Sequence, residues 1–166
     1  MNAEKAAEIL FNCATLLELY GANRHRIARY RYAAQVMLRL GELAPQAAQS
    51  PEALRALGFG ERLTRKLHEL FTTDNLAFYE DLLSDLPYGV VRLMQVPGVG
   101  PKLAFRLHTE LGISSPKALA EAARRGEIHQ LRGFGPRREA AYAAFGRPPA
   151  PVVPEEQLAF DFLKAA

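Results

Sequence analysis

The chain has 166 residues, 49% of them hydrophobic, which suffices for one globular domain or two very small ones. Its formal net charge is only +3, but most of its positive side chains are arginine, whose planar guanidinium suits phosphate recognition. No apolar run is long enough to cross a membrane, and the first 20 residues carry charges that argue against a signal peptide, so we expect a cytoplasmic protein without a membrane partner.

Two amphipathic helices are predicted at the N-terminus, over residues 3–20 and 24–40, each followed by a glycine that ends it. Asn2 is the expected N-cap of the first helix. The single cysteine, Cys13, falls on the apolar face of that helix. We therefore expect a buried thiol in a reducing compartment rather than a nucleophile.

Beyond residue 41, short helices are expected to alternate with glycine-containing corners as far as residue 145. The stretch bounded by Pro45 and Pro51 is expected to be a loop. No segment alternates apolar and polar residues with period 2, so the sequence predicts an all-α fold with almost no strand. Residues 146–156 contain four prolines and are predicted to be an extended linker.

A Gly-x-Gly corner, preceded by apolar positions and followed by a helix, occurs three times, within residues 54–71, 93–111 and 128–145. The first glycines of the three corners are 40 and 35 residues apart, a period typical of a repeated supersecondary unit. Two glycines around one apolar residue permit a tight turn, and the N–H groups at the following helix start attract an anion. Three such corners in series would follow a nucleic-acid backbone.

These corners resemble helix-hairpin-helix motifs, the sequence-nonspecific DNA-binding units of repair proteins. PGVGPKLAFRL is a near-ideal match, RGFGPRREAAY has Arg132 in place of the usual proline, and LGFGERLTRKL lacks the proline. The residues expected to contact DNA are the glycines and nearby basic residues of the three corners: Gly58, Gly60, Arg62 and Arg65; Gly98, Gly100, Lys102 and Arg106; Gly133, Gly135, Arg137 and Arg138. The alternative is a protein-interaction domain that uses such corners without a ligand.

Residues 2–37, followed by the first hairpin, resemble the amino-terminal part of family X DNA polymerases, bacterial members in particular. The resemblance covers roughly residues 1–145. It implies a helical bundle with the first hairpin over residues 1–86 and a tandem helix-hairpin-helix domain over 87–146, and the prolines then predict a linker with a terminal peptide over 147–166. The polymerase palm with its metal-binding aspartates is missing from these residues, so we do not expect a polymerase.

In family X the small domain can be a 5′-deoxyribose-phosphate lyase, in which a lysine forms a Schiff base with the sugar aldehyde. The resemblance places this nucleophile at Lys66, the only lysine of residues 6–101, and an aromatic residue of the site at Tyr30. A lysine attacks as the free amine, and we expect Arg62 and Arg65 to lower its pKa by charge repulsion. Arg65 stands where the family has a glutamate.

The resemblance also implies phosphate contacts by His25 and its basic neighbour Arg26, and Arg29 belongs to the same basic stretch. A basic stretch of the family is replaced by Phe-Tyr-Glu-Asp at residues 78–81. Two interpretations of Lys66 therefore stay open, a catalytic residue of a lyase acting on abasic or 5′-deoxyribose-phosphate ends, or a plain phosphate contact.

The resemblance implies no required cofactor, but it implies that hairpin carbonyl oxygens hold K⁺ or Na⁺ that bridges to a DNA phosphate. By spacing, these carbonyls belong to Leu54, Ala56 and Phe59; Met94, Val96 and Val99; His129, Leu131 and Phe134. The remaining histidines are scattered and there is no second cysteine, so we expect no zinc site.

The terminal sequence QLAFDF resembles the short peptide by which bacterial repair proteins dock on the sliding clamp. Its matching residues are Gln157, Leu158, Phe160 and Phe162, with Phe160 replacing the usual leucine. The Pro-rich tether before it favours a docking peptide. The alternative is that these apolar side chains fold back on the body of the protein.

The sequence therefore predicts a nucleoid-associated DNA-binding protein of repair or recombination. It would grip the phosphate backbone of gapped, nicked or branched DNA without reading bases. A lyase acting through Lys66 and a protein-interaction scaffold are the competing hypotheses.

Overall fold

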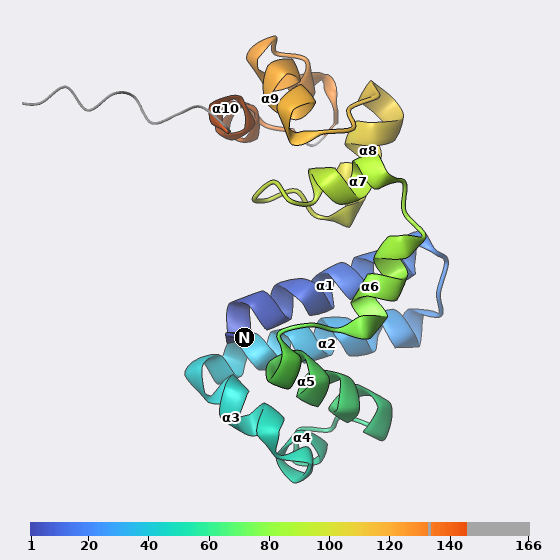
Figure 1. Ribbon diagram of the computed structural model, residues 1–166, viewed down its shortest axis with the longest axis vertical. Helices are drawn as coiled ribbons and strands as arrows, with labels where there is room; N and C mark the ends of the chain where they lie inside the picture. The colour runs from blue at the N-terminus through green and yellow to red at the C-terminus, as the bar shows by residue number, and fades with distance from the viewer. Residues whose placement is uncertain (133, 146–166) are drawn as a thin grey trace, which may run out of the picture. The chain divides into compact units, whose positions relative to one another are not determined.

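The computed structural model describes residues 1–132 and 134–145, and every regular element in these residues is helical, as predicted (Figure 1). The chain divides into two compact units, Met1–Pro116 and Lys117–Ala166. The division into three parts predicted from the sequence stays a prediction. Among the described helices, none is both long enough and apolar enough to span a membrane.

Two long antiparallel helices form the centre of the N-terminal unit, α1 (Ala3–Leu19) and α2 (Arg24–Leu40) (Figure 1). Their bounds agree with the prediction. The Asn2 side chain accepts a hydrogen bond from the Lys5 N–H at 2.8 Å, so Asn2 is the N-cap as expected. Gly41 ends α2 in the left-handed region, with φ of 54°.

The residues predicted to form a loop, 45–51, are mostly helical instead. They lie in two short helices that follow a 3₁₀ turn: η1 (Gly41–Leu43), α3 (Ala44–Gln49) and α4 (Pro51–Ala56). Pro45 and Pro51 each lie in the first turn of a helix, where the missing N–H costs no hydrogen bond. Between them the Ser50 hydroxyl accepts from the Ala53 N–H at 3.2 Å and caps α4. The prolines therefore mark helix starts.

The other helices of the N-terminal unit are α5 (Glu61–Thr73), α6 (Ala77–Ser84), α7 (Tyr88–Leu93) and α8 (Pro101–Leu111). The C-terminal helices are α9 (Pro116–Arg124), η2 (Ile128–Gln130) and α10 (Pro136–Ala144). Helices α5 and α6 pack on α1 and α2 around a core that includes Leu10, Cys13, Met37, Leu67 and Leu70. Cys13 is buried, as predicted.

The first Gly-x-Gly corner is a Schellman helix end. Gly58 has φ of 85°, the Phe59 N–H donates to the Leu54 carbonyl at 3.2 Å, and the Gly58 N–H donates to the Arg55 carbonyl at 2.9 Å. The Leu57 N–H also donates, to the Ala53 carbonyl at 3.1 Å. A proline at Leu57 would remove that donor, which explains why this corner lacks the usual proline.

The second corner is a four-residue turn of another kind. The Val99 N–H donates to the Val96 carbonyl at 3.0 Å, with Pro97 second and Gly98, at φ of 79°, third. This pattern matches a type II turn. In the third corner the Phe134 N–H donates to the Leu131 carbonyl at 3.0 Å, the same separation along the chain. The first corner thus differs from the other two in its hydrogen bonds, although all three are similar in sequence.

Candidate functional site

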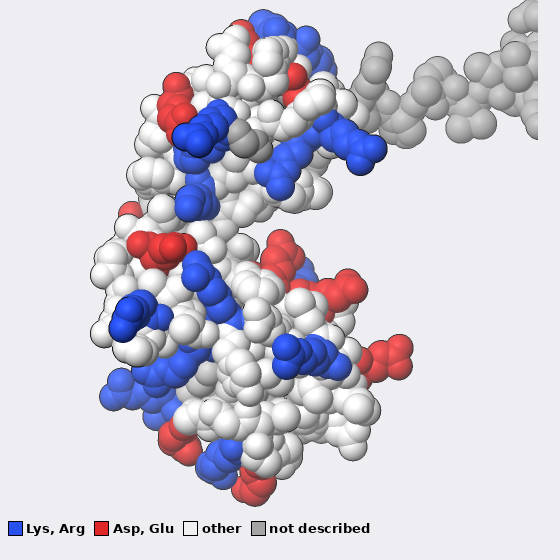
Figure 2. Space-filling model, turned by 180° about the vertical axis from the view of Figure 1, so that it is seen from behind, with Lys and Arg blue, Asp and Glu red and all other residues white. Residues whose placement is uncertain are grey.

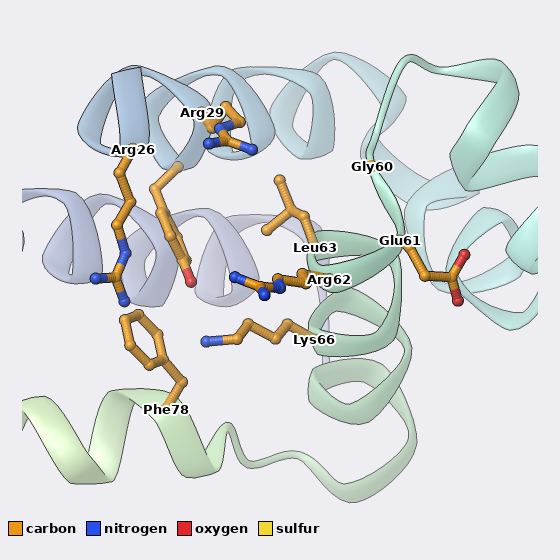
Figure 3. A pocket seen from close by; sticks show the side chains of 9 residues that line it. Arg26, Arg29, Gly60, Glu61, Arg62, Leu63, Lys66 and Phe78 are labelled. Carbon is orange, nitrogen blue, oxygen red and sulfur yellow. The ribbon is translucent and has the colours of Figure 1, made fainter. Parts of the chain in front are cut away.

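A cavity of about 520 Å³ lies in the N-terminal unit, where α2, the start of α5 and α6 face one another (Figure 3). Predicted site residues from separate parts of the sequence line it: Arg26, Arg29, Tyr30, Gly60, Arg62 and Lys66. The other lining residues are Glu61, Leu63 and Phe78. A concave site with several convergent cations is a candidate for binding an anionic group.

Helical periodicity brings the basic residues into the cavity. Arg29 and Tyr30 lie three and four residues after Arg26 on α2, and Lys66 lies four residues after Arg62 on α5, so each set lies on one side of its helix. Figure 3 shows the side chains of Arg62 and Lys66 pointing toward Phe78 and Arg26. Because Gly60 precedes α5 and has no side chain, the N–H groups at the start of this helix border the cavity.

The amine of Lys66 lies against aromatic rings. Its Nζ is 3.0 Å from the centroid of the Phe78 ring and 5.8 Å from that of the Tyr30 ring. The two rings stack with their centroids 5.5 Å apart and their planes at 25°. Among the described residues, no carboxylate lies within ion-pair distance of this amine. The nitrogen is therefore held by packing rather than by a counterion.

Burial lowers the pKa of Lys66 from 10.5 to about 8, and the positive charge of Arg26 acts in the same direction. The carboxylates of Glu69 and Asp81 act against this shift. A large part of the Lys66 amine is thus neutral and nucleophilic near pH 8. A lysine with a depressed pKa inside a cleft is a candidate functional residue.

Arg62 and Arg65, which were expected to lower the pKa of Lys66, are not among the main causes of its shift. Both arginines are exposed, so water and salt screen their charges. Arg26 has the effect instead, and its guanidinium carbon lies 5.0 Å from the centroid of the Phe78 ring that carries Lys66.

Tyr30 forms a wall of the cavity and is only 6% exposed. Burial raises the pKa of its phenol well above the ordinary value of 10. The phenol therefore stays protonated at neutral pH and does not serve as a base.

Of the DNA-contacting and catalytic residues predicted on α2 and around the first corner, three do not line the cavity: His25, Gly58 and Arg65. His25 is exposed at the start of α2, where its N–H is capped by the Asn23 side chain at 2.8 Å, and Arg65 is exposed on α5. The residue that sequence reasoning missed is Phe78. Its aromatic character was visible, but only its packing against Lys66 indicates a role in the site.

The second corner carries less free charge than its sequence indicates. Gly98 and Lys102 are exposed and Gly100 is half-buried. Arg106 forms an ion pair with Glu110, with 2.6 Å between Nε and Oε1. The arginine charge is thus partly neutralised within α8.

The third corner presents Gly135, Arg137 and Arg138 on the exposed side at the start of α10. The Glu139 carboxylate accepts from the N–H groups of Ile128 at 3.0 Å and His129 at 3.2 Å, and lies 3.0 Å from His129 Nδ1. Glu139 thereby ties α10 to η2. Gly133 lies outside the described residues, as do Gln157, Leu158, Phe160 and Phe162 of the clamp-like peptide.

The carbonyls predicted to hold K⁺ or Na⁺ are neutral oxygen donors, which suit a hard monovalent cation. Four of them already accept hydrogen bonds: Leu54, Phe59, Val96 and Leu131. A carbonyl has a second lone pair, so these bonds leave room for an ion. Among the described residues, no three His, Cys, Asp or Glu side chains come together as a metal site.

The charge on the surface is mixed. On the face in Figure 2, Lys and Arg side chains of the N-terminal unit form separate groups, with Asp and Glu side chains between them. Binding of an anionic polymer on this face would depend on local groups of cations rather than on a uniform basic surface.

Comparison with known proteins agrees with this architecture. Residues 90–141 match the family model of the SAM-like helix-hairpin-helix tandem, which covers the second and third corners. The chain is 26% identical, over 139 residues or 84% of its length, to the DNA polymerase/3′-5′ exonuclease PolX of Bacillus subtilis (strain 168). It spans only 24% of the length of that relative. The predicted likeness to the N-terminal part of a family X polymerase is confirmed.

Proposed function

From a helix-hairpin-helix tandem at residues 90–141 and a likeness to part of a DNA polymerase, we propose that the protein binds DNA during repair. It holds the phosphate backbone and does not read bases. The observation that carries this proposal is the cavity in which Arg26 and Arg29 of α2 face the start of α5 with its Arg62 and Lys66. Arginine side chains and helix N–H groups are the usual partners of phosphate oxygens.

The concave shape favours a DNA end over a continuous duplex. A cavity of about 520 Å³ accommodates a terminal phosphate with its sugar, whereas a duplex phosphate contacts a flatter surface. The exposed Lys102 in the first turn of α8 and the exposed start of α10 would hold further phosphates of the same strand or its partner. The preferred ligand is thus gapped or nicked DNA with a 5′-phosphate.

The test is fluorescence anisotropy with a gapped duplex that carries a 5′-phosphate, at a series of salt concentrations. The variants are Arg26→Gln and Arg62→Gln, and Arg39→Gln is the matched control because this exposed α2 arginine does not line the cavity. Each cavity variant should lower the salt slope by about one unit, since each phosphate contact contributes roughly 0.9. Unchanged binding in both cavity variants would contradict the role of the cavity, and absence of DNA binding by the native chain would favour a protein-interaction scaffold.

A second function, a lyase for 5′-deoxyribose-phosphate or abasic ends, is favoured by the state of Lys66. The amine has a pKa of about 8, lies in the phosphate-binding cavity and has no carboxylate partner among the described residues. An amine in this state is suited to attack an aldehyde that is held by its phosphate.

In the proposed reaction, the nitrogen of Lys66 adds to the C1′ aldehyde carbon, and water leaves to give an imine. A C2′ proton then passes to water, the C3′–O bond breaks, and its electron pair leaves with the phosphate of the DNA. Hydrolysis of the imine releases the unsaturated sugar phosphate and restores the amine. Arg26 and Arg62 would orient the phosphate, and Tyr30 and Phe78 would exclude water from the amine.

The lyase is tested by borohydride reduction on a gapped duplex with a 5′-deoxyribose-phosphate. A covalent adduct is expected with the native chain and none with Lys66→Arg, which keeps the positive charge but not the nucleophile. Equal DNA affinity of the two proteins would separate catalysis from binding. Absence of an adduct with the native chain, together with salt-sensitive binding, would leave a DNA-binding protein without this activity.

We also propose two partners on the strength of sequence resemblance. A monovalent cation at the hairpin carbonyls should make DNA affinity depend on the identity of the cation at constant ionic strength, K⁺ or Na⁺ against Li⁺. The QLAFDF peptide should bind the bacterial sliding clamp, and Phe162→Ala should abolish that binding without changing DNA affinity.

A further inference from the structure

The Phe78 ring receives two cations. Lys66 Nζ lies 3.0 Å from its centroid and the Arg26 guanidinium carbon lies 5.0 Å from it, while Tyr30 stacks on the ring. Figure 3 shows Phe78 reaching from α6 toward the space into which Lys66 points. This ring stands where the sequence departs from the basic pattern of the family it resembles.

The face of an aromatic ring attracts a cation through its quadrupole. A neutral amine gains much less from the same contact. Of the two cations on the ring, Arg26 keeps its charge at all accessible pH values, whereas Lys66 does not. Only the lysine therefore changes its attraction to the ring when a proton leaves.

We propose that Phe78 is a positioning residue that works as a proton-dependent latch on Lys66. Its ring holds the ammonium form at the cavity wall and releases the neutral amine to attack an aldehyde. The inference rests on the proposed role of Lys66 as a nucleophile. The latch explains why an aromatic residue stands at position 78, and it gives Lys66 a resting state in which the ammonium is held against the ring.

The other ionisable groups around Lys66 leave it as the group that responds near neutral pH. Burial raises the pKa of the Cys13 thiol on α1 to about 12, and burial also raises that of the Tyr30 phenol on α2 well above its usual range, so both stay neutral. Arg26 stays positive, while Glu69 on α5 and Asp81 on α6 favour the charged amine. Because the lysine pKa is about 8, the latch opens as pH rises through that value.

The ring has two opposing effects on the lysine. As an apolar cover it keeps water away and disfavours the ammonium, and as a π-face it favours the ammonium. Variants at position 78 separate these effects. Phe78→Leu keeps the cover and removes the π-face, Phe78→Tyr keeps both, and Phe78→Ala removes both.

The experiment measures the pH dependence of reductive methylation of Lys66 in the intact chain with formaldehyde and cyanoborohydride. Peptide mass spectrometry reports each lysine separately, and the exposed Lys102 and Lys117 serve as internal controls. Phe78→Leu should lower the pKa of Lys66 by about half to one unit, because the cation–π attraction is lost. Phe78→Tyr should leave it unchanged, and Phe78→Ala should raise it as water enters.

Lower pKa means more free amine. At pH 7 the methylation rate of Lys66 in Phe78→Leu should rise about three- to fivefold, since the neutral fraction grows in that proportion for a fall of half to one unit. Methylation of the exposed control lysines should stay the same, which would show that the change is specific to Lys66.

An unchanged or raised pKa in Phe78→Leu, with unchanged control lysines, would overturn the latch and leave Phe78 as a plain apolar cover. Loss of the native pKa in Phe78→Tyr would overturn it as well. This readout needs no DNA. If the borohydride trap gives no adduct but the Phe78 variants shift the pKa of Lys66 as expected, the lyase is rejected and the latch is kept. If an adduct forms but the pKa shifts are absent, only the latch is rejected.

Discussion

Lys66 is a residue at which the proposed function and stability oppose each other. Its pKa is about 8 in the folded protein and 10.5 in a solvated chain, so the folded state disfavours the ammonium. Between these values the unfolded chain binds more protons than the folded one, and the stability of the native protein rises with pH. Below pH 8 Lys66 is protonated in both the folded and the unfolded state, so the full free-energy cost of burying its charge remains.

We therefore expect Lys66→Met to be more stable than the native protein at pH 7, with the difference shrinking as pH rises from 8 to 10.5. Urea unfolding at pH 7 and pH 9.5 measures this. Lys102→Met, at an exposed position, should show no such pH dependence. A Lys66→Met difference that is the same at both pH values would contradict the assigned cause.

Individual site residues were predictable to different degrees. Lys66 and Tyr30 follow from resemblance to known motifs, and helical spacing places Arg26 and Arg29 on one face with Tyr30. Phe78 did not follow, because its contact with Lys66 depends on how α6 packs across α5. Sequence neighbours are also poor guides to electrostatics, since an adjacent exposed arginine is screened by water.

At the scale of single elements, the first corner depends on the conformation of one glycine. Gly58 has φ of 85° and Gly60 has φ of −74°, and nothing lies within 4 Å of a Cβ at either position. Gly58→Ser should cost about 1–2 kcal/mol, because a side chain disfavours the left-handed region. Gly60→Ser should keep or slightly raise stability, since serine is a good N-cap for α5.

Chemical denaturation of the two serine variants checks this prediction. The pair is matched, because both add the same side chain to the same corner and both positions are open. Equal stability of the two would mean that the Schellman end does not determine the first corner.

The third corner depends on Glu139. Hydrogen bonds from the N–H groups of His129 and Ile128 and from the His129 ring lower the pKa of this carboxyl, although partial burial opposes the shift. Its contribution is therefore present above the ordinary pKa of 4.5 and is lost as pH falls through the lowered value. Glu139→Ala should speed hydrogen exchange at the two amides by tenfold or more, roughly the loss of one charged hydrogen bond each.

Glu121→Ala, an exposed change on α9, is the control for hydrogen exchange and should leave both amides protected. In the native protein, protection at Ile128 and His129 should persist at pH 6 and fall only under acidic conditions. Protection that is the same in Glu139→Ala would show that η2 is held by its apolar packing alone.

Most elements were predictable because their patterns were redundant. Helices α1 and α2 combine amphipathic spacing, an asparagine cap and terminal glycines, and their bounds agree with the prediction. The segment from Pro45 to Pro51 was misread because proline marks both loops and helix starts. Its helices α3 and α4 are short and rich in alanine, so the hydrophobic pattern of the sequence shows little helical periodicity there.

At the scale of the whole molecule, the N-terminal unit contains its own core and the complete Lys66 cavity. We expect a chain of residues 1–116 to fold by itself. It should unfold in one cooperative step in urea and keep the low pKa of Lys66 in the methylation experiment. A broad transition, or an ordinary lysine pKa, would show that the C-terminal unit is needed to form the cavity.

The different turns of the first two corners also set a limit on consensus design. Copying the second corner, the nearest match to the motif, into the first would place proline before Gly58 as well as before Gly98. Pro97 fits its turn, but Leu57→Pro would delete the hydrogen bond to the Ala53 carbonyl and distort the end of α4, at roughly 3 kcal/mol. Residues at corresponding positions of these similar repeats are therefore not interchangeable, and each corner has to be engineered according to its own hydrogen bonds.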